Sequence, residues 1–239
     1  MNRLEGKHVV VTGAGTGIGR AIAERLASDG ARLTLLARDE ARLRDVAPGA
    51  SARGLDIRDE AAVRAAFTEP LDALIANAGI GGPNEPGDGD RFDDVVRTNL
   101  YGTYWCIRAA EPLLADGGRI VVVSSILARI GVSGYTAYCA SKAGLLGLVR
   151  AFAAELAPRR IQVNAICPGW VDTDMAWEGL SLWDGLTQDE AWEEAKREVP
   201  LRRMSAPEEI AGTVAWLLSD DSLGVTGQAI DHNNGAFMS

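Results

Sequence analysis

Short apolar runs alternate with helical patterns along nearly all of the 239 residues. The runs predict strands over residues 9–12, 33–37, 52–55, 73–76, 119–124 and 162–166, with a last short strand at 228–231. The spacing of apolar residues between them predicts helices over residues 18–29, 39–46, 59–67, 91–115, 137–157 and 207–218. The strands are near-continuously apolar, as expected when helices cover both faces of a sheet. The pattern therefore predicts an α/β fold, a doubly wound sheet of about seven parallel strands.

Two segments interrupt this alternation. Residues 79–90 are rich in Gly, Pro and acidic residues, which predicts a loop after the fourth strand. Residues 172–200 carry Trp177, Trp183 and Trp192 among acidic residues, and long loops in compact domains are often lids. We therefore expect one domain over residues 1–239 with a substrate lid at about 172–200. The three tryptophans either line the cleft or pack between helices or subunits.

Composition and charge exclude several classes of protein. The net charge of −9 argues against binding to nucleic acid, because no basic stripe is available to neutralise phosphates. No apolar run approaches the roughly 18 residues of a membrane span, and residues 1–7 do not resemble a signal peptide. Cys106, Cys139 and Cys167 lack the spacing of a zinc site or a disulfide framework. We expect a cytoplasmic protein with no membrane or metal partner.

A glycine-rich turn follows the first predicted strand. Val9-Val10-Val11-Thr12 runs into Gly13-Ala14-Gly15-Thr16-Gly17-Ile18-Gly19, and a helical pattern begins there. Glycines let the backbone approach a pyrophosphate closely, and a helix N-terminus offers free N–H groups and a positive dipole end. The spacing is Gly-x-x-x-Gly-x-Gly, not the Gly-x-Gly-x-x-Gly of the commonest dinucleotide fingerprint. Taken alone, the turn fits a tight strand-to-helix connection equally well.

Tyr138 and Lys142 lie four residues apart, and this spacing puts them on one face of a predicted helix. The ordinary pKa of a tyrosine is about 10, and a nearby ammonium lowers it. The pair is therefore a candidate proton donor and acceptor near neutral pH. Tyr-x-x-x-Lys also occurs by chance on helix surfaces, so the spacing needs support from elsewhere in the chain.

That support comes from six elements that occur in a particular order. They are Thr12-Gly-x-x-x-Gly-Ile-Gly19, Asn77-Ala78-Gly79, Asn99, Ser125, Tyr138-x-x-x-Lys142 and Pro168-Gly169. Together they resemble the short-chain dehydrogenase/reductase family, from Gly6 to about Gly235. The resemblance implies a Rossmann fold, a nicotinamide cofactor, and carbonyl reduction or alcohol oxidation by hydride transfer. Ligands of open α/β sheets bind outside the carboxyl ends of the strands, where these elements are expected to meet.

The resemblance assigns a catalytic role to four residues. Tyr138 is the general acid for carbonyl reduction, or the base for alcohol oxidation. Lys142 lowers the pKa of Tyr138 and binds the nicotinamide ribose. Ser125 holds the substrate oxygen, with Ser124 as the competing candidate, and Asn99 holds a water in a proton relay.

The resemblance also implies a set of cofactor-binding positions. Asp56 and Ile57 match positions that pack on the adenine, while Thr173 and the Val171 backbone match positions that contact the carboxamide. The complete set is Gly13, Gly15, Thr16, Gly17, Ile18, Gly19, Arg38, Asp56, Ile57, Asn77, Ala78, Gly79, Tyr138, Lys142, Pro168, Gly169, Val171 and Thr173.

The end of the second predicted strand bears on the choice of cofactor. An acid there binds the 2′-hydroxyl of NAD, whereas an arginine accommodates the 2′-phosphate of NADP. Ala37 stands in place of the usual acid and Arg38 follows it, which favours NADP. NAD stays possible, because Thr16 stands where many NADP users carry a basic residue and Asp39 could turn inward to replace the missing acid.

The segment from Pro168 to Arg203 resembles 3-oxoacyl and polyketide ketoreductases of the family. This favours a bulky apolar ketone or a 3-oxoacyl-type substrate. The alternatives are an NAD-dependent dehydrogenase of a hydroxyl substrate in a degradation pathway, and a cofactor-binding regulator without turnover. The complete catalytic set argues against the regulator.

The resemblance further implies a homotetramer, or a dimer, through helices 91–115 and 137–157 and the stretch from Glu208 to Gln228. The chain departs from the family at Asp231-His232-Asn233-Asn234-Gly235, where many relatives carry a Gly-Gly pair.

Overall fold

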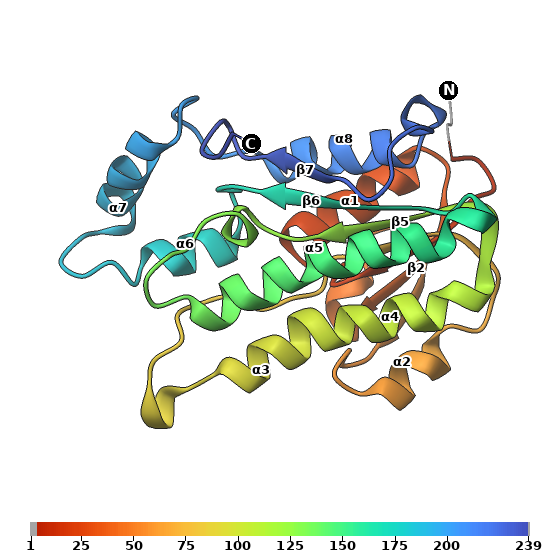
Figure 1. Cartoon of the computed structure of the whole chain (residues 1–239), viewed down its shortest axis with the longest axis horizontal. Coiled ribbons are helices and arrows are strands. Elements are labelled where there is room, and N and C mark those ends of the chain that lie inside the picture. Colours follow the sequence, from red (N-terminus) through yellow and green to blue (C-terminus); the bar gives the residue numbers. More distant parts are fainter. Residues whose placement is uncertain (1–3, 239) are drawn as a thin grey trace.

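A seven-stranded parallel sheet forms the centre of the molecule (Figure 1). The computed structural model describes residues 4–238. Residues 1–3 and 239 of the predicted domain lie outside the described residues, and so does the first part of segment 1–7. The strand order is β3-β2-β1-β4-β5-β6-β7, and every neighbouring pair is parallel. The strands are β1 (His8–Thr12), β2 (Arg32–Ala37), β3 (Ser51–Gly54), β4 (Leu71–Ala76), β5 (Leu114–Val123), β6 (Gln162–Pro168) and β7 (Ala229–His232). The predicted doubly wound sheet is confirmed.

Alternate residues of each central strand enter two separate cores. Val9 and Val11 of β1 point to one face of the sheet, whereas Val10 points to the other. All three are almost fully buried, because helices cover both faces. This explains why the strands read as continuously apolar in the sequence.

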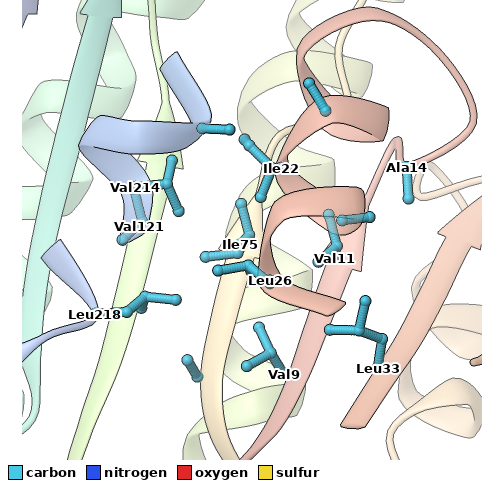
Figure 2. Packing of buried hydrophobic residues seen from close by; sticks show 14 of the residues in the cluster. Val9, Val11, Ala14, Ile22, Leu26, Leu33, Ile75, Val121, Val214 and Leu218 are labelled. Carbon is cyan, nitrogen blue, oxygen red and sulfur yellow. The ribbon is translucent and has the colours of Figure 1, made fainter. Parts of the chain in front are cut away.

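Helices α1 (Gly17–Ser28) and α8 (Pro207–Leu217) pack side by side on the first face. Ile22 and Leu26 of α1 lie against strand side chains such as Ile75 (Figure 2). Each is fully buried, and burial of such a side chain contributes about 1.5–3 kcal/mol. The helices of the second core are α2 (Glu60–Ala66), α4 (Gly102–Ala110) and α5 (Thr136–Leu156).

Two predicted helices differ from the structure. The helix expected over 91–115 is divided into α3 (Phe92–Val96), a π-helical turn (Arg97–Tyr101), α4 and a 3₁₀ turn (Glu111–Leu113), after which β5 begins. The helix expected over 39–46 is only a 3₁₀ turn (Glu40–Leu43), capped by Asp39. A π turn inserts one extra residue and often marks a functional site, and this one contains Asn99.

The segment expected to be a lid contains α6 (Asp174–Leu180) and α7 (Gln188–Ala195), which project beyond the carboxyl ends of the strands (Figure 1). Leu180 of α6 packs with two alanines of α7 into a small core, and Trp170, Trp177 and Trp192 pack against it. The Nε1 of Trp177 also donates to Asp172 at 2.7 Å. Two of the three tryptophans of residues 172–200 therefore pack within this segment, whereas Trp183 is exposed.

Candidate active site

The carboxyl ends of four neighbouring strands bring the predicted motifs to one edge of the sheet. The glycine turn follows β1, and Asn77-Ala78-Gly79 follows β4. Ser124 and Ser125 follow β5, and Gly169 follows Pro168, the last residue of β6. Because these strands are adjacent and parallel, the four loops meet at one edge of the sheet, where open α/β sheets bind their ligands in a crevice.

The glycine turn is packed too tightly for side chains at two of its positions. A Cβ on Gly19 would overlap the carbonyl oxygen of Gly13, and a Cβ on Gly13 would lie 2.8 Å from the Cα of Ala78. The Nδ2 of Asn77 donates to the carbonyl oxygens of Thr12 and Gly13, each at 3.1 Å. Asn77 and Ala78 therefore hold the turn in place from the neighbouring strand.

The N-terminus of α1 fits an anionic ligand. Thr16 is the N-cap, but its side chain makes no capping hydrogen bond, and the first turn carries no acidic residue. Gly17 adopts a φ of 50°, and a Cβ there would lie 3.2 Å from Cγ2 of Thr173. The amides of Gly17, Ile18 and Gly19 and the positive end of the helix dipole suit the pyrophosphate of a dinucleotide.

Asn99 holds the loop after β4 from beneath. It is fully buried, its Oδ1 accepts from the Ile80 N–H at 2.8 Å, and its Nδ2 donates to the Ile80 carbonyl at 2.9 Å and to Ser141 Oγ at 3.1 Å. A Cβ on Gly79 would lie 3.1 Å from Asn99 Oδ1 and 3.4 Å from Lys142 Nζ. Both amide hydrogens of Asn99 are used, so a relay water would have to bind Oδ1 or the main-chain carbonyl.

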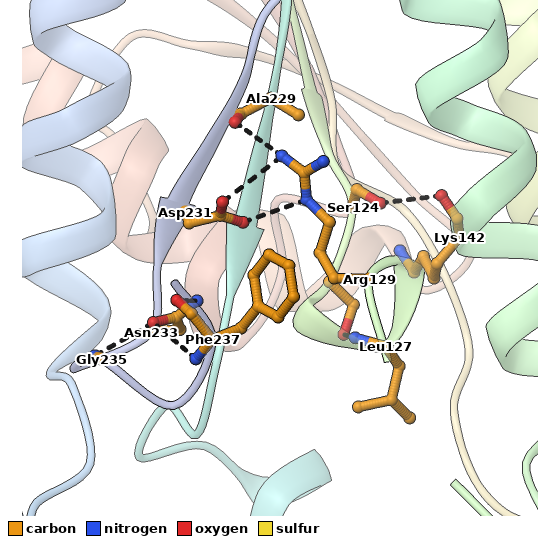
Figure 3. A network of polar contacts seen from close by, with 10 residues as sticks. Ser124, Leu127, Arg129, Lys142, Ala229, Asp231, Asn233, Gly235 and Phe237 are labelled. Carbon is orange, nitrogen blue, oxygen red and sulfur yellow. Dashed lines mark hydrogen bonds and ion pairs between the residues drawn. The ribbon is translucent and has the colours of Figure 1, made fainter. Parts of the chain in front are cut away.

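The two adjacent serines have different partners. Ser124 Oγ donates to the carbonyl oxygen of Lys142 at 2.9 Å, which ties β5 to α5 (Figure 3). Ser125 Oγ accepts from the Leu127 N–H at 3.1 Å, and it is near enough to the Tyr138 phenol for hydrogen bonding with it to lower the pKa of that phenol. The geometry favours Ser125 over Ser124 as the residue that meets a substrate oxygen.

Tyr138 and Lys142 lie together on α5, with the Lys142 ammonium 5.5 Å from the centroid of the Tyr138 ring. Lys142 is buried, and its Nζ donates to the Val123 carbonyl at 3.0 Å. Burial lowers the pKa of Lys142 to about 8. Burial also raises the pKa of Tyr138 to about 12, against a smaller lowering by the hydrogen bond with Ser125.

The direction of the Tyr138 shift differs from the expectation that Lys142 lowers this pKa. Burial of the phenol disfavours the charged phenolate and so raises the pKa of Tyr138. Burial also disfavours the charged ammonium and so lowers the pKa of Lys142. Tyr138 therefore keeps its phenolic proton at neutral pH and can donate it.

The opposite end of the crevice is exposed and charged. Arg38 lies at the surface after β2 and its charge contributes to a lowered pKa of Asp56, for which hydrogen bonding to Arg58 is the largest cause. Asp39 does not turn inward, because it caps the 3₁₀ turn through the Ala41 N–H at 3.0 Å and pairs with Arg42 at 3.4 Å.

The remaining predicted positions are placed as follows. The Ile57 side chain is buried against Gly102 of α4, so contact with an adenine would use its backbone. Val171 is buried and pairs with Ser205 in an isolated parallel bridge. Thr173 caps α6, and its Oγ1 donates to the Val171 carbonyl at 3.2 Å.

The chain is similar in sequence to proteins of one known family. A family model described as enoyl-(acyl carrier protein) reductase matches residues 13–236. The chain is 37% identical to a 3-oxoacyl-[acyl-carrier-protein] reductase of Staphylococcus aureus, over 97% of this chain and 98% of that protein. It is 35% identical to the reductase of the same name from Escherichia coli, over 98% and 99%. The chain belongs to the short-chain dehydrogenase/reductase family.

Solved structures agree with this membership. Levodione reductase superposes with a TM-score of 0.90 at 32% identity, over 98% of each chain. The ligand-free aldohexose dehydrogenase of Thermoplasma acidophilum superposes with a TM-score of 0.87 at 29% identity, over 97% of this chain and 94% of that one. As a member of this family, the protein is a nicotinamide-dependent oxidoreductase.

Sequence reasoning missed two residues of this short-chain dehydrogenase/reductase site. Ser141 is fully buried and links the Asn99 side chain to the Tyr138 carbonyl, to which its Oγ donates at 2.9 Å. A small polar residue directly before Lys142 was the available signal. Met175 lies over Gly81, where a Cβ would be 3.3 Å from its sulfur and 3.8 Å from the Tyr138 ring. Met175 belongs to the segment from Pro168 to Arg203 that resembles ketoreductases of the family, but the resemblance gave it no role in the site.

Two further properties of the described residues complete the site's surroundings. In residues 4–238, no group of three or more His, Cys, Asp or Glu side chains is arranged to hold a metal ion. None of the helices in that range is both long and apolar enough to cross a bilayer.

Proposed function

We propose that this oxidoreductase reduces a carbonyl group with NADPH and uses Tyr138 as the general acid. The observation that carries the proposal is the group of Ser125, Tyr138 and Lys142, in which Ser125 and Lys142 are buried and Tyr138 is half-buried. The bound nicotinamide supplies the hydride, or accepts it in the reverse direction.

The protein's own residues orient the substrate and supply the proton. Ser125 Oγ holds the carbonyl oxygen, and Tyr138 donates its phenolic proton to that oxygen. A donor at this position contributes about 10²–10⁴-fold to the rate. Lys142 offers its ammonium to a ribose hydroxyl and favours the tyrosinate that remains, and Asn99 holds the relay water.

The preference for NADP rests on the adenosine end of the crevice. Arg38 is exposed there with Ala37 before it, and Asp39 is occupied by its cap and its ion pair with Arg42. A guanidinium in this place suits a 2′-phosphate. NAD-dependent oxidation of a hydroxyl substrate is the second candidate, because Thr16 adds no charge to the glycine turn.

The substrate class is a bulky apolar ketone or a 3-oxoacyl compound. Met175, Leu182, Trp183 and Leu186 are exposed apolar side chains of the lid segment. The bacterial relatives are named 3-oxoacyl-[acyl-carrier-protein] reductases. Packing of Trp177 and Trp192 inside the lid reduces the apolar surface available to such a substrate.

The same proposal includes a homotetramer in the cytoplasm. The rings of Tyr101, in the π turn, and Trp105, in α4, lie in tilted contact with their centroids 5.8 Å apart, and Tyr101 is 51% exposed. A helix face of this kind suits a second copy of the chain. Light scattering after size-exclusion chromatography measures the assembly directly.

The decisive experiment is a spectrophotometric assay of NADPH and NADH consumption. The panel contains apolar ketones, 3-oxoacyl thioesters and quinones, and Tyr138→Phe serves as the inactive control. We expect consumption of NADPH with at least one oxoacyl or ketone compound and little with NADH. Absence of turnover with every carbonyl, or equal turnover by Tyr138→Phe, contradicts the proposal.

A further inference from the structure

We propose that the C-terminal turn, residues 231–237, is a clamp that positions the Ser125 turn and the segment directly after the lid for catalysis. This inference rests on the proposed function, because positioning is defined by the reaction at Ser125 and Tyr138. Three sets of contacts carry it, and two of them use asparagine side chains.

The first contact holds the turn that carries Ser125. Ser125 is the N-cap of a 3₁₀ turn, and Arg129 is its C-cap. The Arg129 guanidinium reaches across to β7, where Nε and Nη2 contact the Asp231 carboxylate at 3.2 and 3.4 Å and Nη2 donates to the Ala229 carbonyl at 3.0 Å (Figure 3). The ring of Phe237 lies against the same guanidinium, 5.8 Å from centroid to carbon.

This ion pair is shielded from water on most sides. The side chains of Arg129 and Asp231 are only 22% and 15% exposed. A shielded and bidentate pair holds its geometry better than a surface pair. The Ser125 turn is therefore fixed at its far end by a strand that is distant in sequence.

The second contact orders the end of the chain. Asn233 is buried, its Oδ1 accepts from the Gly235 and Phe237 N–H groups at 3.0 and 3.4 Å, and its Nδ2 donates to the Phe237 carbonyl at 3.1 Å. A Cβ on Gly169 would lie 2.9 Å from the Asn233 Cβ. Asn233 thus holds Phe237 against Arg129 and packs against the turn after β6.

The third contact reaches the segment that directly follows the lid. Asn234 Nδ2 donates to the Arg203 carbonyl at 3.1 Å and to Ser205 Oγ at 3.0 Å, and the Leu201 N–H donates to the Asn234 carbonyl at 3.2 Å. Ser205 in turn pairs with Val171, the residue directly before the lid. One residue therefore ties the segment directly after the lid, residues 201–205, to the C-terminal turn.

Asn234 offers a clean variant. Its φ of 55° lies in the left-handed region, which glycine adopts without strain. Asn234→Gly therefore removes the two side-chain hydrogen bonds and leaves the backbone conformation favourable. Asn233→Gly removes the contacts to Phe237, and Asp231→Asn removes the charge that holds Arg129.

The matched control is Asp116→Asn. It breaks the ion pair of Arg159 and Asp116, at 3.0 Å, at the opposite end of β5 from the crevice. This control variant also removes one Asp charge from an Arg–Asp pair, but it lies outside the clamp.

The test combines hydrogen–deuterium exchange with steady-state kinetics on the full-length protein. We expect faster exchange at residues 125–130 in Asp231→Asn and at residues 200–205 in Asn234→Gly, with residues 71–76 unchanged. We expect kcat of Asp231→Asn to fall about tenfold and the substrate KM of Asn234→Gly to rise several-fold, because small displacements of reacting groups are costly. The dissociation constant of NADPH is expected to stay within about twofold of the wild-type value.

The outcomes separate the clamp from the proposed function. Unchanged exchange at both segments overturns the clamp, as does faster exchange throughout the chain or faster exchange without any kinetic change. If the wild-type protein consumes no reduced cofactor with any carbonyl, the proposed function fails, and the exchange data alone then decide whether the turn restrains the two segments.

Discussion

The two ends of the crevice are built on different physical principles. At the catalytic end, Asn99 and Lys142 are buried and each polar group has a defined partner. At the adenosine end, Arg38 and Asp39 are exposed, and the contacts of Asp39 are a cap and a surface ion pair. A buried polar network fixes geometry because an unpaired member is costly, whereas exposed charges can change at little cost in stability. The chemistry of this protein is therefore more firmly specified than its choice of cofactor.

The largest effect is expected at the catalytic end, from Tyr138→Phe. Loss of the phenolic proton should lower kcat by about 10²–10⁴-fold and leave NADPH binding nearly unchanged. Tyr135→Phe is the matched control, since Tyr135 lies three residues earlier and is partly buried. Stopped-flow or steady-state absorbance measures the rate. Similar losses in both variants would mean that the region, and not the Tyr138 hydroxyl, is responsible.

Variants of the two adjacent serines test whether each hydroxyl at the buried end has a separate role. Ser125→Ala should lower kcat about 10²-fold, because the substrate oxygen loses its donor. Ser124→Ala should leave kcat within a few-fold but lower the free energy of unfolding by about 1 kcal/mol, because the Lys142 carbonyl loses its partner. Kinetics and urea denaturation of both variants separate these effects. A larger kinetic loss in Ser124→Ala would reverse their roles.

The adenosine end should respond more mildly, and only toward one cofactor. Arg38→Ala should raise KM for NADPH about tenfold, because the 2′-phosphate loses roughly one charge-assisted hydrogen bond. The KM for NADH should stay unchanged, because NADH has no 2′-phosphate. Arg53→Ala is the control, because this arginine of β3 donates instead to the Ala66 carbonyl. Equal KM values for NADPH in wild type and Arg38→Ala would place the 2′-phosphate elsewhere.

The smallest effect is expected in the pH profile of carbonyl reduction. Lys142 has a pKa of about 8 and loses its charge as the pH rises through that value, whereas Tyr138 keeps its proton up to a pKa of about 12. The rate should therefore be level below pH 8 and decline above it. Lys142→Arg keeps its charge throughout, so its alkaline limb should move to higher pH. Profiles of kcat from pH 6 to 10 check this, and identical limbs would exclude Lys142 as their cause.

Local patterns predicted most of the sheet. The predicted strand at residues 9–12 and the observed β1 differ by one residue, and the motifs that follow β1, β4, β5 and β6 meet as expected. The prediction succeeded because apolar runs and glycine turns act over a few residues. It failed where distant groups compete, as at the π turn that aims Asn99 at Ile80.

Other features depend on burial in the folded chain, which the spacing of residues in the sequence does not show. The sign of the Tyr138 pKa shift followed from loss of water and not from the nearby charge of Lys142. The sequence left open whether Trp177 and Trp192 line the cleft or serve packing, and in the folded chain they pack with Trp170 against the small core of residues 180–195. The resemblance to the family already favoured Ser125 over Ser124, and the hydrogen bond of Ser124 Oγ to the Lys142 carbonyl agrees with that choice.

The amino-acid order by itself determined the alternation of strands and helices, the glycine turn and the residues that gather at one edge, because these depend on local conformation and side-chain chemistry. Only the folded chain decided how Asn233 and Asn234 join the C-terminal turn to Pro168-Gly169 and the segment directly after the lid. Those contacts cross about 30 to 65 residues of sequence, and they exist because the pairing of β6 with β7 brings the last turn back beside the crevice.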